Sequence, residues 1–155
     1  MTIAPTLQTY LDQNVTYDLI SHEPAMTSMH TAQACHISGD DLAKGIVLRR
    51  NGAYILAVLP ASHRIHFSDL RLQLGDDISL ASEDEIAQLF LDCARGAVPP
   101  IGNCYGLDVV IDESINERPE VYMEGGDHET LIHMGHTQFA KLTKDARHGR
   151  FSVHD

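Results

Sequence analysis

The chain has 155 residues, and its 11 Lys and Arg against 22 Asp and Glu give a net charge of −11 with histidine neutral. Hydrophobic residues make up 43% and charged residues 21%, which excludes long disorder and collagen-like structure. The length predicts a single domain over residues 1–155 that needs no metal or disulfide to stabilise its core. The acidic balance disfavours bulk electrostatic capture of nucleic acid or of an anionic membrane.

The sequence predicts a cytoplasmic protein. It contains no stretch of about 18 uninterrupted apolar residues, the length that a membrane span requires. Residues 1–5 lack the basic start and the apolar run of a signal peptide. The three cysteines, at positions 35, 93 and 104, are odd in number and widely spaced, which argues against a disulfide framework and indicates reduced thiols.

Two helices and a short strand are predicted at the start of the chain. Pro5 suits the first turn of a helix, and Thr27 or Ser28 is a suitable cap for the second one. Pro24 ends the intervening strand, because proline cannot donate to a β-ladder. These predicted elements are helix 5–14, strand 17–20 and helix 28–36.

A β-hairpin is the clearest predicted element. Residues 45–50 and 53–59 flank Asn51-Gly52, a dipeptide that suits a two-residue type I′ turn because both positions need positive φ. Parts of both strands are apolar on both faces, so we expect the hairpin to be central and covered on two sides.

Short helices and strands alternate irregularly after the hairpin. The acids Glu83, Asp84 and Glu85 fall in the first turn of one predicted helix, where the helix dipole favours them. Without a regular βαβ rhythm, this pattern indicates an α+β fold with a mixed, largely antiparallel sheet. The predicted elements are helices 68–74, 83–94 and 137–144, strand 107–111, and a second hairpin of strands 121–124 and 129–134 around residues 125–127.

Lys44 is the first residue that could carry chemistry. It shares one face of the first predicted hairpin with Ile46 and Leu48, which places an ammonium group at the edge of an apolar surface. One interpretation is a lysine that keeps its charged end in water. The alternative is a positive charge at the mouth of a pocket, suited to a phosphate or a polarised carbonyl.

The loop over residues 96–102 is the second candidate feature. Its two glycines let backbone N–H groups approach a ligand closely, and its two prolines stiffen the turn. Such a loop could present amides to a carbonyl or an oxyanion, or it could be an ordinary surface turn.

Histidine and cysteine give weaker signals. The chain has ten histidines, and the pairs His63/His66 and His133/His136 have a spacing that can share a metal on a helix. Both pairs fall on loop-like or glycine-interrupted stretches, so surface histidines are favoured and no metal site is predicted. The cysteines at 35 and 93 fit packing positions, whereas Cys104 could line a pocket. Nucleophile-elbow, P-loop and dinucleotide motifs are absent from the sequence.

Three segments taken together carry a family resemblance. They are residues 42–49, the loop 96–102 and residues 125–134. Their order and spacing resemble the YbaK/prolyl-tRNA synthetase editing-domain family of aminoacyl-tRNA deacylases, over residues 15–143. The loop is similar to the family's GxxxPxG motif through Gly96, Pro100 and Gly102, and Lys44 lies where that family has its characteristic lysine.

The resemblance implies a fold and an activity. The fold would be a mixed sheet, partly rolled into a barrel, with flanking helices. The activity would be hydrolysis, in trans, of the ester of mischarged tRNA, with tRNA-Pro carrying a small amino acid as the expected substrate. Water would attack with help from the ribose hydroxyl of the substrate, without a cofactor. The expected partners are the acceptor end of aminoacylated tRNA and prolyl-tRNA synthetase.

The resemblance also assigns roles to particular residues. Lys44 would hold the phosphate or carbonyl side of the acceptor end, and His128 would orient water or ribose. The residues expected to act in catalysis are Lys44, Gly96, Pro100, Gly102 and His128. The residues expected to contact the substrate are His22, Thr27, Ile46, Ile101, Gly125 and Gly126.

Two other functions stay open at this point. A non-catalytic binding or regulatory module that kept the pocket would fit the acidic surface. The other alternative is an unrelated or metal-dependent hydrolase, which bound metal at His63/His66 or His133/His136 would favour. A basic strip around the mouth of the Lys44 pocket would favour the deacylase, and a pocket filled by side chains would favour the binding module.

Overall fold

The predicted first hairpin forms the centre of the sheet. In the computed structural model, which describes residues 3–155, Asn51 and Gly52 adopt positive φ angles of 51° and 81°. They join β2 (Leu42–Arg50) to β3 (Ala53–Pro60), which pair antiparallel over most of their length. Both strands start or end close to the predicted limits, so the local turn signal is confirmed. Met1 and Thr2, part of the stretch in which we predict no signal peptide, lie outside the described residues.

The strands form one large mixed sheet and a separate two-stranded ribbon. The order in the large sheet is β1-β8-β7-β2-β3-β6-β9, with β5 added beside β2, while β10 pairs with β4. The pairs β2–β7, β3–β6 and β6–β9 are parallel and the other pairs are antiparallel. The remaining bounds are β1 (Asp18–Ser21), β4 (His63–Ile65), β5 (Ile78–Leu80), β6 (Asp108–Asp112), β7 (Glu120–Glu124), β8 (Thr130–Gly135), β9 (Arg147–Gly149) and β10 (Ser152–His154).

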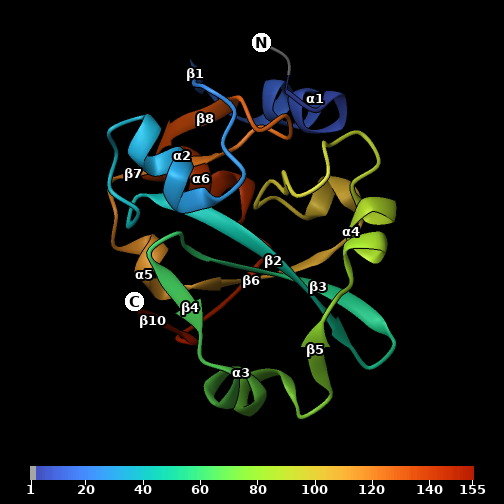
Figure 1. Cartoon of the computed structure of the whole chain (residues 1–155). Helices are drawn as coiled ribbons and strands as arrows, with labels where there is room; N and C mark the ends of the chain where they lie inside the picture. The colour runs from blue at the N-terminus through green and yellow to red at the C-terminus, as the bar shows by residue number, and fades with distance from the viewer. Residues whose placement is uncertain (1–2) are drawn as a thin grey trace.

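The predicted α+β class with a mixed, largely antiparallel sheet is confirmed. Within residues 3–155 the edge strands β1 and β9 do not pair with each other, so the sheet does not close into a barrel. The helices are α1 (Pro5–Asn14), α2 (Ser28–Ala34), α3 (Phe67–Leu74), α4 (Glu83–Leu89), α5 (Glu113–Asn116) and α6 (His136–Leu142), with a 3₁₀ turn at Asn103–Tyr105. The strands β2 and β3 cross the middle of the molecule, with α1 and β8 towards one end and α3 towards the other (Figure 1).

One predicted helix ends early. The spacing of Ile86, Leu89, Phe90 and Cys93 predicts a helix to residue 94, but α4 ends at Leu89. Phe90 leaves the helical region, with φ −115° and ψ 64°, and its ring is buried against the ring of Tyr105. Tertiary packing of this aromatic side chain therefore overrides the local periodicity.

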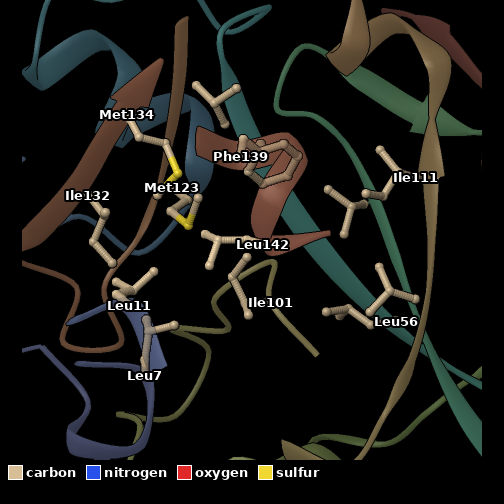
Figure 2. Close-up of a cluster of buried hydrophobic side chains, with 14 of the residues drawn as sticks. Leu7, Leu11, Leu56, Ile101, Ile111, Met123, Ile132, Met134, Phe139 and Leu142 are labelled. Carbon is tan, nitrogen blue, oxygen red and sulfur yellow. The ribbon is translucent and has the colours of Figure 1, made fainter. Parts of the chain in front are cut away.

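Apolar side chains cover both faces of the central hairpin, as predicted. On one face, α1 and α6 bring Leu7 and Phe139 against the sheet, together with Ile101 from the connecting loop (Figure 2). On the other face, Leu70 of α3 and the buried ring of Phe151 pack against the strands. Within residues 3–155, no helix has the length and hydrophobicity that a bilayer crossing needs.

Candidate functional site

A gap in strand pairing along β2 forms one wall of a cavity. On the edge facing away from β3, β7 pairs with Leu42 and Ala43, and β5 pairs with residues 48–50. Residues 44–46 between these two partners have no strand beside them on this edge within the described part of the chain. A cavity of about 310 Å³ is lined by residues 42–47. The strand therefore offers an open backbone edge to this space.

Four other segments complete the cavity. It is lined by the start of α2, by α4 with Phe90, by the first half of the loop 96–102 and by the turn between β7 and β8. The lining residues from these segments include Thr27, Ser28, Thr31, Ile86, Ala87, Phe90, Gly96, Val98, Glu124 and His128. The lining is thus mainly apolar with a few polar groups, which is typical of a small-molecule site.

Gly45 supplies the open backbone groups in this wall. Neighbouring residues of a strand direct their backbone groups to opposite edges, and the Val47 carbonyl accepts from the Ala81 amide at 3.1 Å on the cavity edge. Gly45 lies two residues before Val47 and so faces the same edge. Within residues 3–155, no hydrogen bond engages the Gly45 N–H or C=O there. Both groups are therefore available to a ligand.

Lys44 lines the cavity, and two backbone carbonyls hold its ammonium group. The Lys44 Nζ donates to the His63 carbonyl at 2.6 Å and to the Ala61 carbonyl at 3.4 Å. Burial lowers the pKa of Lys44, and the charge of Asp155 partly opposes that shift. An ammonium has three N–H donors, so one donor remains for a ligand. Lys44 thus lines the cavity, as the pocket alternative requires, while two protein carbonyls already accept from its ammonium group.

His128 lies in the cavity wall with both ring nitrogens close to carbonyl oxygens. Its Nε2 is 2.7 Å from the Arg95 carbonyl and its Nδ1 is 3.2 Å from the Ala25 carbonyl. The residue is buried and has a positive φ of 62°. His128 therefore links the loop after α4 to the segment before α2, and its expected role in orienting water or ribose stays a prediction.

Glu124 is a cavity residue that is not among those predicted from the sequence. One carboxylate oxygen, Oε1, accepts from the amides of Gly126, Asp127 and His128 at 2.9, 3.1 and 2.9 Å. This arrangement fixes a half-buried carboxylate at the end of β7. A glutamate directly before two glycines is the signal that could have indicated it, because such turns expose several amides to one acceptor.

The second half of the glycine- and proline-containing loop lies elsewhere. Pro100 and Gly102 line a different cavity, of about 300 Å³, and Ile101 is fully buried in the core. Gly102 has a packing role, since a Cβ there would lie 2.7 Å from Val109 Cγ2. Of this loop, Gly96 and Val98 line the cavity with Lys44. The catalytic roles expected of Pro100 and Gly102, and the substrate contact expected of Ile101, gain no support from this placement.

Some of the expected substrate-binding residues line the cavity with Lys44, and the others do not. Thr27 and Ile46 line the cavity. The ring of His22 does not line it, and its Nδ1 lies 2.7 Å from the Glu23 carbonyl. Gly125 and Gly126 approach the start of α1 closely, since the Gly125 carbonyl accepts from the Ala4 amide and a Cβ on Gly126 would lie 3.0 Å from Ala4 Cβ. The two glycines thus shape the turn that carries His128.

All three thiols are free, and burial raises the pKa of each. Cys93 lines the cavity, and burial raises its pKa to about 11. Burial also raises the pKa of Cys104 to about 11, and this residue lines neither of the two cavities described above. Among residues 3–155, no three His, Cys, Asp or Glu side chains are grouped as a metal ion would require.

Two arginines that contact α4 are paired with its acids. Arg95 lines the cavity and forms ion pairs with Asp84 and, at 3.9 Å, with Glu83. Arg49 of β2 pairs with Glu85 at 2.8 Å. These two arginines do not form the free basic strip that is expected around the mouth of a tRNA-binding pocket. The cavity itself is open rather than filled by side chains.

Comparison with known proteins gives one family match. The sequence profile of the aminoacyl-tRNA editing domain family matches residues 22–142 of the chain. No curated protein sequence matches the chain. The matched range contains Lys44, Gly96, Glu124 and His128, and so spans the cavity described above.

Solved structures share the fold at low sequence identity. One, described as a candidate trans-editing enzyme for prolyl-tRNA synthetase, gives a TM-score of 0.84 at 21% identity over 98% of this chain and 99% of that one. Another, described as a hypothetical protein, gives 0.84 at 20% identity over 96% and 99%. A candidate signal transduction protein from Marinobacter aquaeolei VT8 gives 0.77 at 19% identity over 96% of this chain and 30% of that one.

Proposed function

The chain belongs to the aminoacyl-tRNA editing domain family, and we propose that it is a trans-acting deacylase that hydrolyses the ester of mischarged tRNA. We further propose tRNA-Pro carrying a small amino acid as its substrate and prolyl-tRNA synthetase as a partner. The observation that carries the proposal is the open edge of β2 at Gly45, beside Lys44, in the wall of the cavity.

The chemistry suits a site without a protein nucleophile. An aminoacyl ester is already activated, so the site must position water and stabilise the oxyanion. Water would attack the ester carbonyl carbon, the bond to the ribose oxygen would break, and that oxygen would take a proton as amino acid and tRNA separate. The Gly45 amide and the third N–H of Lys44 are donors for the carbonyl oxygen. Cys93, with its pKa raised to about 11, is a poor nucleophile near neutral pH.

The size of the cavity supports a small aminoacyl group. At about 310 Å³ it lies at the lower end of the range for ligand pockets, which is about 300–1,000 Å³. Ile46, Ile86 and Phe90 would limit the length of the amino-acid side chain. A hydrophobic wall discriminates by about 1–3 kcal/mol per methylene group, so we expect a gradual rather than an absolute preference.

A panel of mischarged tRNAs tests this proposal. Each tRNA is labelled in its amino acid and incubated with the protein, and loss of the ester is followed in time. We expect the fastest loss for a small amino acid on tRNA-Pro and a much slower loss for Lys44→Ala. If the parent protein leaves every ester in the panel intact at catalytic concentrations, the deacylase proposal is wrong.

A binding or regulatory module is the second candidate. The pairing of Arg49 and Arg95 with acids favours it, because paired cations attract a phosphate backbone weakly. The likeness to a candidate signal transduction protein is a further reason to test it. This function would show as tight binding of a small ligand in the cavity without turnover of any ester.

A further inference from the structure

The proposed function leaves one cavity group without a role. The Glu124 carboxylate uses Oε1 for three backbone amides, whereas no described residue forms a hydrogen bond with its Oε2. No Lys, Arg or His nitrogen of residues 3–155 lies within ion-pair distance of it. Three backbone amides already stabilise this half-buried carboxylate through Oε1, so Oε2 is the acceptor that remains for a ligand.

The charge of Glu124 acts inside the cavity. Burial is the main cause of the raised pKa of Cys93, and the negative charge of Glu124 adds to it. Cys93 lines the same cavity, so the field of the carboxylate reaches a second lining residue. Glu83 is the other acid in the lining, and its side chain is 86% exposed. Glu124 is therefore the less exposed of the two acids that line the cavity.

We propose that the free oxygen of Glu124 binds the α-ammonium group of the aminoacyl ester. This inference rests on the proposed function and adds the recognition of the amino group to it. An aminoacyl ester carries a carbonyl, which suits the Gly45 amide and Lys44, and an ammonium group one carbon away, which needs an anion. Oε1 cannot swing away because three amides hold it, so Oε2 is preorganised for the ammonium group.

The contact between Glu124 and the α-ammonium group also predicts that the site distinguishes esters with a free amino group from esters with an acylated one. N-acetylation removes the positive charge and adds bulk next to the carboxylate, so an N-blocked ester should be a poor substrate. A hydrogen bond to a charged group accounts for a preference of about 10- to 100-fold. The site would then distinguish a charged aminoacyl ester from a peptidyl or N-acylated one.

The test compares alanyl-tRNA with N-acetyl-alanyl-tRNA as substrates of the parent protein, of Glu124→Gln and of Glu129→Gln. Glutamine keeps an oxygen for the three amides and removes the charge. Glu129 is an exposed acid of the same hairpin and serves as the matched control. We expect the parent protein and Glu129→Gln to favour the free amino group by about 10- to 100-fold, and Glu124→Gln to lose most of that preference.

Binding measurements separate this inference from the deacylase proposal. The ligands are 3′-deoxy-3′-alanylamino-adenosine, whose amide link resists hydrolysis, and its N-acetyl form. If no ester is hydrolysed but the parent protein prefers the free amino ligand and Glu124→Gln does not, the assignment of Glu124 stands and the deacylase proposal falls. If the parent protein treats both members of each pair equally, or folded Glu124→Gln keeps the full preference, the assignment of Glu124 is wrong. Even where Glu124→Gln does not fold, equal binding of the two ligands by the parent protein overturns the assignment.

Discussion

The Lys44 ammonium donates to the His63 carbonyl oxygen at 2.6 Å. His63 is the first residue of β4, and β4 pairs only with β10 among the described strands. The position of the one lysine in the cavity wall therefore depends on the final strand of the described chain. This link joins a residue of the central hairpin to a segment that is more than a hundred positions away in the sequence.

Replacement of Lys44 by alanine should reduce deacylation by roughly 10²–10³-fold, the usual loss when one preorganised electrostatic contact is removed. The fold should persist, because Lys44 contributes charge to the site more than packing to the core. The measurements are kcat/KM on the best substrate and the melting temperature. Lys141→Ala, in an exposed position of α6, is the control and should keep both values. Near-full activity of folded Lys44→Ala would remove Lys44 from the mechanism.

The thiols should react slowly with alkylating reagents. A pKa of about 11 leaves Cys93 and Cys104 almost fully protonated at pH 8, so iodoacetamide should label them on the order of 100-fold more slowly than a thiol with an ordinary pKa of about 8.5. Mass spectrometry of timed samples gives the rates. Serine at either position should leave most of the deacylation rate, because water is the proposed attacker. Rapid labelling of Cys93 together with an inactive, folded Cys93→Ser would favour a cysteine nucleophile instead.

Glu85 should make stability depend on acid pH. Hydrogen bonds from Arg49, Tyr54 and the Ser82 amide lower the pKa of Glu85 to about 2. Since the folded value lies below the unfolded value of about 4.3, the contribution is present above that unfolded pKa and is lost as the pH falls towards 2. Melting temperatures between pH 7 and pH 2 should fall less steeply for Glu85→Gln than for the parent protein. Exposed Glu23→Gln is the control, and parallel curves for the parent protein and Glu85→Gln would contradict this role.

Local signals in the sequence predicted the elements that local chemistry decides. Asn51-Gly52 determines a turn by the φ angles it permits, and the apolar strands on either side fit a central hairpin. The four short strands β4, β5, β9 and β10 were missed, because three-residue segments such as His63–Ile65 are stable only through pairing with a distant partner. The early end of α4 was missed for a similar reason, since burial of Phe90 is a tertiary effect.

Only part of the candidate site was predicted, because the rest of it also depends on tertiary structure. Lys44 and Gly96 could be placed together from the order of three segments. The loop 96–102, however, changes surroundings within a few residues, so its motif spacing did not show that Pro100 and Gly102 face another cavity. Glu124 was missed because the folded turn, and not the local sequence, directs three backbone amides to its Oε1. The same turn leaves Oε2 without a hydrogen bond from a described residue.

The loop 96–102 packs directly on β2 at Gly45. A Cβ at Gly45 would lie 2.9 Å from Leu56 Cδ1 and 3.3 Å from Pro100 Cα. The leucine methyl can shift, but the proline atom belongs to the backbone of a stiff loop. Gly45→Ala should therefore destabilise the fold by about 1–3 kcal/mol, as overpacked cores do, and displace the loop that carries Gly96 into the cavity wall.

Deacylation by Gly45→Ala should fall more than the loss of folded protein explains, because both the loop and the open edge of β2 shape the site. Denaturant unfolding and kcat/KM at a temperature where the variant stays folded give the two quantities. Gly135→Ala is the matched control, since its φ is −71° and the nearest atom to its Cβ would be 3.9 Å away. If Gly45→Ala matches the parent protein in stability and in kcat/KM, the close packing of loop and strand has no part in forming the site.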